Sequence, residues 1–197
     1  MQYAKIALAG FVVHFGANKQ GHRSMSKSMA RVRRALEDAG LTPTIIETTG
    51  ARTAQEAADA VGCGLDQIAK SIIFRAETSG DAVLFLTAGG NQVCPRKASA
   101  LAGQPLGKAD AALIRAQTGF AIGGVSPVGH LSPIRAWADP RLMDFGKVWA
   151  AAGTPNHVFA LCPQDLPRLC GAVVADFTQY IPKNPVKTVE FWCQKSF

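Results

Sequence analysis

IAKSIIFRAETSGDAVLFLTA, residues 68–88, predicts a β-hairpin in the middle of the chain. Two runs rich in β-branched and aromatic residues, 68–76 and 82–88, flank the polar segment ETSGD, which is typical of a turn between paired strands. The first run is apolar on both faces, as strands buried in the middle of a sheet are. We therefore expect residues 68–76 to form a central strand.

Helical and extended segments surround this hairpin in mixed order. We expect helices at 28–39, 53–62, 95–102, 110–118 and 162–171. We expect further strands at 44–48, 133–139, 147–153, 157–162 and 172–177. Thr53 and Glu56 form a T-x-x-E pattern that predicts a capping box. This order favours an α+β fold, a single compact domain whose mixed β-sheet is flanked by helices.

Basic residues gather at the two ends of the chain. Residues 1–34 carry seven Lys/Arg and no acid, whereas residues 35–182 carry 11 Lys/Arg and 13 Asp/Glu. We expect residues 1–26 to be a basic extension, 27–180 to be the folded domain, and 181–197 to be a tail outside the core. The basic side chains of 27–34 could attract RNA phosphate or form an ordinary solvated helix face, and both interpretations stay open. They are Lys27, Arg31, Arg33 and Arg34.

Composition excludes several classes of protein. The apolar run at residues 6–13 is much shorter than the ~20 residues that span a bilayer, so we expect no membrane association. The five cysteines form no CxxC pair, and none has a histidine at zinc-ligand spacing. We therefore expect reduced thiols, a cytoplasmic protein, and neither a metal ion nor another cofactor.

Lys70 is the first candidate functional residue. The period of two in a strand places Lys70 on the face that also carries Ile72 and Phe74. A lysine on such an apolar face either extends to solvent along its alkyl chain or lines a cavity.

The glycine-rich segment GFAIGGVSPVGH, residues 119–130, is the second candidate. Gly123 and Gly124 allow positive φ angles, Pro127 fixes its own φ, and Ser126 before it is held extended. Such a loop can leave successive amides unpaired in a concavity that suits a phosphate or an oxyanion, or it can be a plain turn. It is neither a G-x-G-x-x-G motif nor a P-loop, and Ser126 lacks the G-x-S-x-G context of a serine hydrolase.

Two histidines and two aspartates are weaker candidates. His130 follows the loop, and His157 lies beside Asn156 in the GTPNH turn. Each histidine is either a general acid or base or an ordinary surface residue. Asp139 and Asp144 are best explained as turn or capping residues.

Three separated segments carry a resemblance to a known family. They are ARTAQEAADAVGCGLDQIAKSIIF, TGFAIGGVSPVGH and VWAAAGTPNHVFALCPQDLPRLCGAVVAD. In this order they resemble the YbaK family of prolyl-tRNA-synthetase-associated editing domains, over residues 32–177. The resemblance implies a domain that hydrolyses, in trans, the ester between tRNA and a wrong amino acid. The implied partners are mischarged tRNA, chiefly tRNA(Pro), and prolyl-tRNA synthetase.

The resemblance also implies roles for individual residues. The family's functional lysine matches Lys70, and its G-x-x-x-P loop matches Gly123, Gly124, Val125, Ser126 and Pro127, which we expect to be catalytic. We expect substrate binding from Ser71, Gly129, His130 and Asn156. Ser71 stands where a threonine is common, and the GTPNH turn lacks the acid that some members carry. The amino acid removed is thus open among Cys, Ala, Ser and Thr. A non-catalytic tRNA-binding or regulatory module is the alternative.

Overall fold

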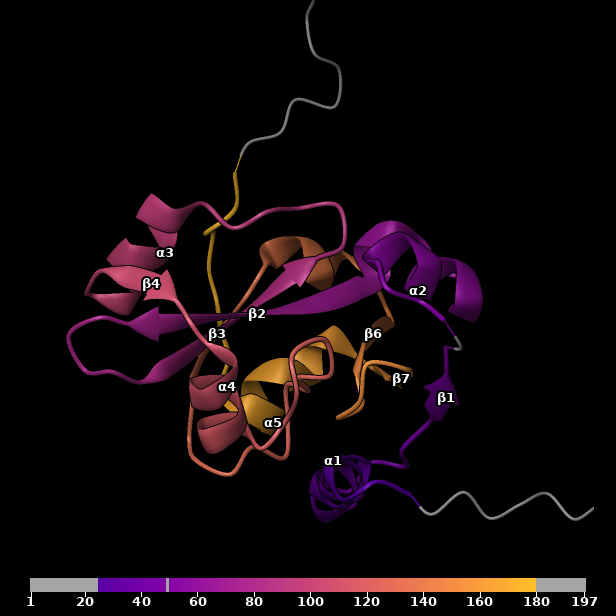
Figure 1. The fold of residues 1–197 in the computed structure, drawn as a ribbon. Helices are drawn as coiled ribbons and strands as arrows, with labels where there is room; N and C mark the ends of the chain where they lie inside the picture. Colours follow the sequence, from indigo (N-terminus) through magenta and orange to yellow (C-terminus); the bar gives the residue numbers. More distant parts are fainter. Residues whose placement is uncertain (1–24, 49, 180–197) are drawn as a thin grey trace, which may run out of the picture.

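A computed structural model describes residues 25–48 and 50–179 (Figure 1). Its helices are α1 Lys27–Asp38, α2 Ala54–Val61, α3 Pro95–Ala102, α4 Ala111–Thr118 and α5 Leu166–Cys170. Its strands are β1 Ile45–Glu47, β2 Ile68–Ala76, β3 Ala82–Ala88, β4 Leu106–Lys108, β5 Arg135–Ala138, β6 Val148–Ala151, β7 His157–Leu161 and β8 Val173–Val174. Short 3-10 turns are η1 Leu65–Gln67, η2 Pro140–Asp144 and η3 Pro163–Asp165. The described strands form one mixed sheet in the order β1-β7-β6-β2-β3-β5-β8, with β4 beside β2.

The predicted hairpin lies at the centre of this sheet. β2 and β3 are antiparallel from the pair Ala69–Ala88 to the pair Arg75–Ala82. Every residue of β3 is buried, in agreement with its unbroken apolar sequence. The prediction of a central strand at residues 68–76 is confirmed.

Two strands pair with the second edge of β2 and leave a gap between them. β6 runs parallel to β2 at Ile68 and Ala69, whereas β4 pairs with the segment from Phe74 to Ala76. In the described part of the chain, no strand pairs with this edge at residues 70–73. The sheet is therefore open beside Lys70 and the three residues after it.

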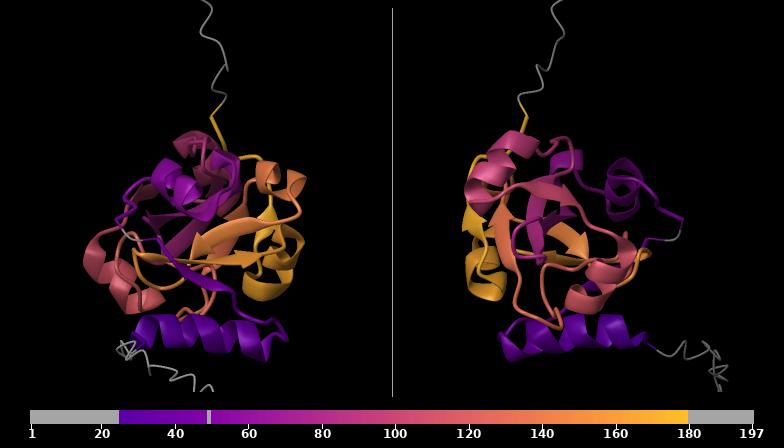
Figure 2. Two further views of the ribbon diagram at one scale, coloured as in Figure 1. Left: turned by 90° about the vertical axis from the view of Figure 1, so that its right-hand side faces the viewer. Right: turned by 60° about the vertical axis from the view of Figure 1, so that its left-hand side comes forward.

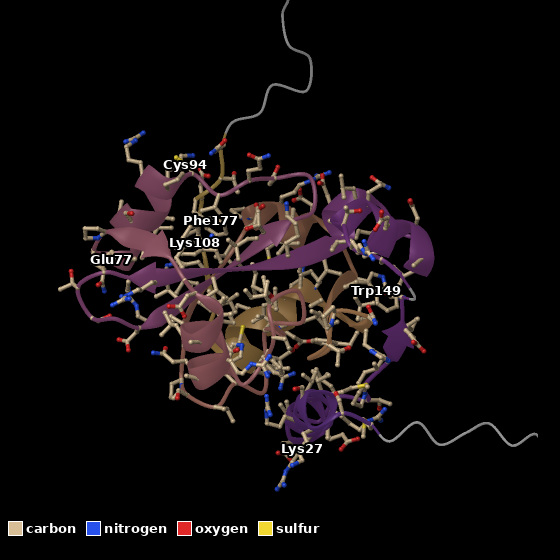
Figure 3. All side chains as sticks on the ribbon, in the orientation of Figure 1. Lys27, Glu77, Cys94, Lys108, Trp149 and Phe177 are labelled. Carbon is tan, nitrogen blue, oxygen red and sulfur yellow. The ribbon has the colours of Figure 1, made fainter. Side chains whose placement is uncertain are left out.

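Helices cover both faces of the sheet, as two further views show (Figure 2). α1, α4 and α5 lie on one face, and α2 and α3 lie on the other. The larger apolar cluster includes Leu36 of α1, Ile114 of α4 and Leu166 of α5. On the opposite face, smaller clusters form around Phe177 and Trp149, which are labelled in Figure 3. The expected mixed sheet flanked by helices is thus confirmed.

Local sequence signals explain the best-predicted elements. The capping box of α2 forms as expected, because Thr53 Oγ1 accepts from the Glu56 amide and the Glu56 carboxylate accepts from the Thr53 amide. Gly62 ends α2 in the left-handed conformation with φ 68°. α1 begins one residue earlier than expected, since Ser26 caps it by accepting from the Met29 amide.

The structure differs from the expected elements in three places. β4 was not expected, because Leu106–Lys108 carries no alternating pattern and becomes a strand only by pairing with β2. The expected strand at 172–177 shortens to Val173–Val174, because the chain then leaves β5 and the Phe177 carbonyl accepts from the Cys94 amide. The expected helix at 162–171 divides into η3 and α5, a tight turn that leads into a short helix.

The predictions for the two ends of the chain fall on residues that lie largely outside the described ones. The basic extension 1–26 is described only at Met25 and Ser26, and the tail 181–197 is not described. Among the described residues, no helix has the length and apolar character needed to cross a membrane.

Candidate active site

A cavity of about 330 Å³ lies at the open edge of β2. Lys70 and Ser71 line it from β2, and Gly123 and Val125 line it from the glycine loop. The opposite wall comes from α2 and from β6, whose Trp149 lies below α2 in Figure 3. Two segments predicted separately from the sequence are thus brought to one site.

Lys70 does not extend freely into solvent. Its ammonium group donates a hydrogen bond of 2.6 Å to the Asn91 carbonyl, and the side chain lines the cavity. Burial lowers the pKa of Lys70, and the carboxylates of Asp139 and Asp66 oppose this shift. Of the two alternatives for Lys70, the structure therefore favours the cavity.

Asp139 holds the segment that meets Lys70. Its buried carboxylate accepts hydrogen bonds from the Ala88 amide at 3.1 Å and from Asn91 Nδ2 at 2.8 Å. The second oxygen caps η2 by accepting from the Arg141 amide, which confirms the capping role predicted for Asp139. The Asn91 carbonyl, which accepts the hydrogen bond from Lys70, thus belongs to a residue whose side chain is held by Asp139.

The glycine loop contains two buried amides without partners. Val125 is 4% exposed and Ser126 is fully buried. Within the described residues, neither of their amides donates a hydrogen bond. A buried amide without a partner is costly, and since Val125 lines the cavity whereas Ser126 does not, the Val125 amide is the better placed of the two to receive an oxygen of a ligand.

The prediction for Gly124 was wrong in two respects. Its amide is not free, because it donates to the Ala121 carbonyl at 3.0 Å and closes a turn. Its φ is not positive, whereas Gly123 has φ 84° as expected. Glycine is needed at 124 for space instead, since a Cβ there would lie 2.7 Å from the Thr154 backbone.

The C-terminal part of the loop faces a different hollow. Pro127, Gly129 and His130 line a second depression beside α5 and not the cavity at β2. His130 Nε2 lies 2.6 Å from the Ser126 carbonyl, and since a carbonyl only accepts, this nitrogen carries the proton. Burial lowers the pKa of His130, which favours the neutral ring. The structure therefore makes His130 a support of the loop and does not bring it to the cavity.

The turn before β7 contributes a residue that the predicted set left out. Asn156 is exposed and does not line the cavity, whereas its neighbour His157 does. His157 Nδ1 lies 2.6 Å from Thr154 Oγ1, which fixes the ring. A histidine at the first position of a strand was a visible signal, but the sequence could not tell into which space it points.

Arg52 and Ser71 are further polar residues of the lining. Arg52 is exposed at the cavity, and no sequence pattern distinguished it from a surface arginine. Ser71 Oγ is buried and has no hydrogen-bond partner among the described residues. A hydroxyl in this state can bond to a polar group of a ligand.

The described cysteines play no part in this cavity. Cys63, Cys94, Cys162 and Cys170 are free thiols, and none of them lines it. Burial raises the pKa of Cys170 to about 11, so its thiol stays protonated at neutral pH. A nucleophilic role for any of these four is therefore not supported.

Comparison with known proteins identifies the family. The family model described as the aminoacyl-tRNA editing domain matches residues 48–169. The chain belongs to this family. The matched segment contains both Lys70 and the whole glycine loop, so the editing domain includes every wall of the cavity, while α1 lies before it. The resemblance to the YbaK type of editing domain is thus confirmed.

Individual relatives agree with this assignment. One solved structure is described as a candidate trans-editing enzyme for prolyl tRNA synthetase. Its sequence is 45% identical to this chain, and the two structures align with a TM-score of 0.74 over 80% of this chain and 100% of the solved one. The structure of hypothetical protein APE2540 is 29% identical, with TM-score 0.69, over 76% and 99% of the two chains. The uncharacterized protein YwhH of Bacillus subtilis (strain 168) is 35% identical over 62% of this chain and 77% of its own.

Proposed function

We propose that this editing domain is an aminoacyl-tRNA deacylase that hydrolyses mischarged tRNA in trans. One observation carries the proposal: Lys70 and Val125, whose amide has no partner, line a single cavity, and the unpaired amide of the buried Ser126 comes next along the loop. The solved relative described as a candidate trans-editing enzyme supports the reaction in trans and the link to prolyl-tRNA synthetase. Because its substrate is tRNA, we expect the protein to act in the cytoplasm.

The amides would stabilise the transition state. When water attacks the ester carbonyl, negative charge develops on the carbonyl oxygen, the carbon–oxygen ester bond breaks, and the ribose oxygen leaves with a proton. Val125 and Ser126 would donate their amide hydrogens to the charged oxygen. One such donor is typically worth about 3 kcal/mol of transition-state stabilisation.

Lys70 would bind the substrate at the other side of the ester. Its ammonium could hold a phosphate or hydroxyl of the terminal adenosine, or it could polarise the carbonyl. The nucleophile would be water, or the substrate's own thiol if the amino acid is cysteine. His157 lines the same cavity and would orient the water molecule or the free amino group of the substrate.

The cavity walls would select a small amino acid. The lining is largely apolar, with Ile68, Ile72, Trp149 and Val158 among its residues. An apolar wall discriminates by about 1–3 kcal/mol per methylene, enough to disfavour proline against alanine or cysteine. The Ser71 hydroxyl could bond to a serine or threonine substrate. We propose tRNA(Pro) that carries Cys, Ala, Ser or Thr as the substrate group.

A panel of mischarged tRNA(Pro) species tests the proposal. We expect the wild-type protein to release at least one of these four amino acids and the Lys70→Ala variant to lose this activity. Lys97→Ala is the matched control, because Lys97 of α3 pairs with Asp176 and does not line the cavity. Tight binding of charged tRNA without release of any amino acid would instead support a non-catalytic tRNA-binding module.

A further inference from the structure

We propose that Arg31 of α1 is a positioning residue that holds the loop with the unpaired amides in its active shape. The inference rests on the proposed function and adds to it a residue that lies outside the matched editing segment. Arg31 does not touch the cavity, so it would act only through the loop. The sequence left open whether Arg31 attracts RNA phosphate or belongs to a solvated helix face, and the structure directs its guanidinium to the loop instead.

Arg31 joins the two ends of the glycine loop. Its Nη2 donates to the Gly119 carbonyl at 2.7 Å, and its Nε donates to the Gly129 carbonyl at 3.2 Å. The guanidinium also lies over the Phe120 ring, 4.9 Å from the ring centre. One planar cation therefore fixes the start and the end of a segment of eleven residues, 119–129, whose middle contains Val125 and Ser126.

The glycines of the loop are shaped around this contact. A Cβ at Gly119 would lie 2.4 Å from Arg31 Nη2, and a Cβ at Gly129 would lie 3.1 Å from the Arg31 carbonyl. Both residues have positive φ angles, 74° and 76°. The absence of side chains at Gly119 and Gly129 thus allows close contact between the loop and α1, and the absence of one at Gly124 allows close contact with the Thr154 backbone.

A chain of contacts leads from Arg31 to the unpaired amides. Phe120, which Arg31 covers, packs edge-on against His130 at 5.8 Å between ring centres. His130 in turn donates to the Ser126 carbonyl. The orientation of the Ser126 residue, and with it the neighbouring amides, is therefore set from α1. Loss of the Arg31 side chain would remove its hydrogen bonds to both loop ends, while the cavity-lining residues outside the loop stayed in place.

Steady-state deacylation by Arg31→Ala and Arg31→Lys measures this effect. We expect kcat to fall by about 100-fold, as for a misplacement of about 1 Å, with KM changed less than threefold or so. Arg31→Lys keeps the charge but cannot bond both carbonyls at once, so it should resemble the alanine variant. Arg168→Ala is the matched control, because Arg168 donates to the Ala39 carbonyl at the other end of α1 and does not touch the loop. It should lower thermal stability and leave kcat unchanged.

Hydrogen exchange separates this inference from the proposed function. Exchange of the amides in residues 119–129 should become faster in the Arg31 variants and stay unchanged in Arg168→Ala. Unchanged kcat in both folded Arg31 variants, or an equal loss of kcat in Arg168→Ala, would overturn the inference. If wild-type protein released no amino acid while the loop exchange changed as expected, the proposed function would fail and the role of Arg31 in shaping the loop would stand.

Discussion

The backbone of Thr154 occupies the space in which a side chain at residue 124 would begin. This contact, and not a special backbone angle, explains the glycine at this position. The loop has to lie against the turn between β6 and β7 for Gly123 and Val125 to reach the cavity. At the scale of single residues, the site therefore depends on the absence of a side chain at residue 124 as well as on the side chains that line the cavity.

Gly124→Ala tests this reading of the loop. We expect a loss of about 1–3 kcal/mol in the free energy of unfolding, because the new methyl group meets backbone that cannot move aside cheaply. Chemical denaturation provides the measurement. Gly146→Ala is the control, since a Cβ at Gly146 meets no atom within 4 Å, and its stability should stay near that of the wild type. Equal stabilities for the two variants would contradict the close contact.

The first turn of α2 illustrates the scale of secondary-structure elements. The Glu56 carboxylate accepts from the amides of Arg52 and Thr53, and these hydrogen bonds hold the pKa of Glu56 below its ordinary value. Ala54 and Ala57 of the same helix line the cavity. An ionised Glu56 thus helps to hold one wall of the site.

This arrangement predicts an acid-dependent loss of stability. Because the folded pKa is lowered, the contribution of Glu56 is fully present above the ordinary glutamate pKa of the unfolded chain and is lost as the pH falls through the folded value. Glu56→Gln should remove this part of the pH dependence. Thermal unfolding of both proteins between neutral and acid pH measures it, and identical pH profiles would show that the carboxylate contributes nothing. A glutamate introduced at residue 55 would not replace Glu56, because the side chain of residue 55 is directed to Asp59 and not to the amides that begin the helix.

Elements with strong local signals could be predicted, and elements made by tertiary contact could not. The hairpin β2–β3 follows from two runs rich in β-branched and aromatic residues around a polar turn, and the capped helix α2 follows from the T-x-x-E pattern. β4 has no such signal and exists because β2 offers it an unpaired edge. The gap at residues 70–73, where the cavity opens, follows from the placement of β4 and β6 and was invisible for the same reason.

For the whole molecule, the basic helix α1 has two different sides. Arg31 is bound to the loop, whereas Arg33 and Arg34 pair with Glu37 and Asp38 at 3.9 and 3.7 Å on the outer side. Figure 3 shows Lys27 on this helix, directed away from the sheet. Exposed pairs of this kind contribute less than about 1 kcal/mol, so their arginines can exchange a carboxylate for a phosphate.

The outer arginines should contribute to tRNA affinity but not to the choice of amino acid. Replacing Arg33 and Arg34 together by alanine should weaken binding at low salt and reduce the slope of log affinity against log salt by about two. Arg75→Ala/Arg96→Ala removes the same charge from exposed positions on other elements and serves as the control. Equal binding curves for the two double variants would show that α1 is not a docking surface.

The site was predictable where a residue carries its own chemical signal. Lys70, Ser71, Gly123 and Val125 were expected from the strand pattern and the resemblance, and they meet at the cavity. Arg52 and His157 also line it, but their positions depend on how α2 and β7 fold against β2. The separation of Gly129 and His130 from the cavity likewise depends on the path of the loop and not on its composition.

Lys70, at the open edge of β2, also gives the cavity a reactive nucleophile. Because burial favours its neutral amine, a larger fraction of Lys70 than of surface lysines is nucleophilic near neutral pH. A small activated ester that fits between the loop and α2 would place its electrophilic carbon near this amine. Brief treatment with a limiting amount of reagent should therefore label residue 70 before the other described lysines, and the same reactivity offers a starting point for covalent inhibitors of the domain.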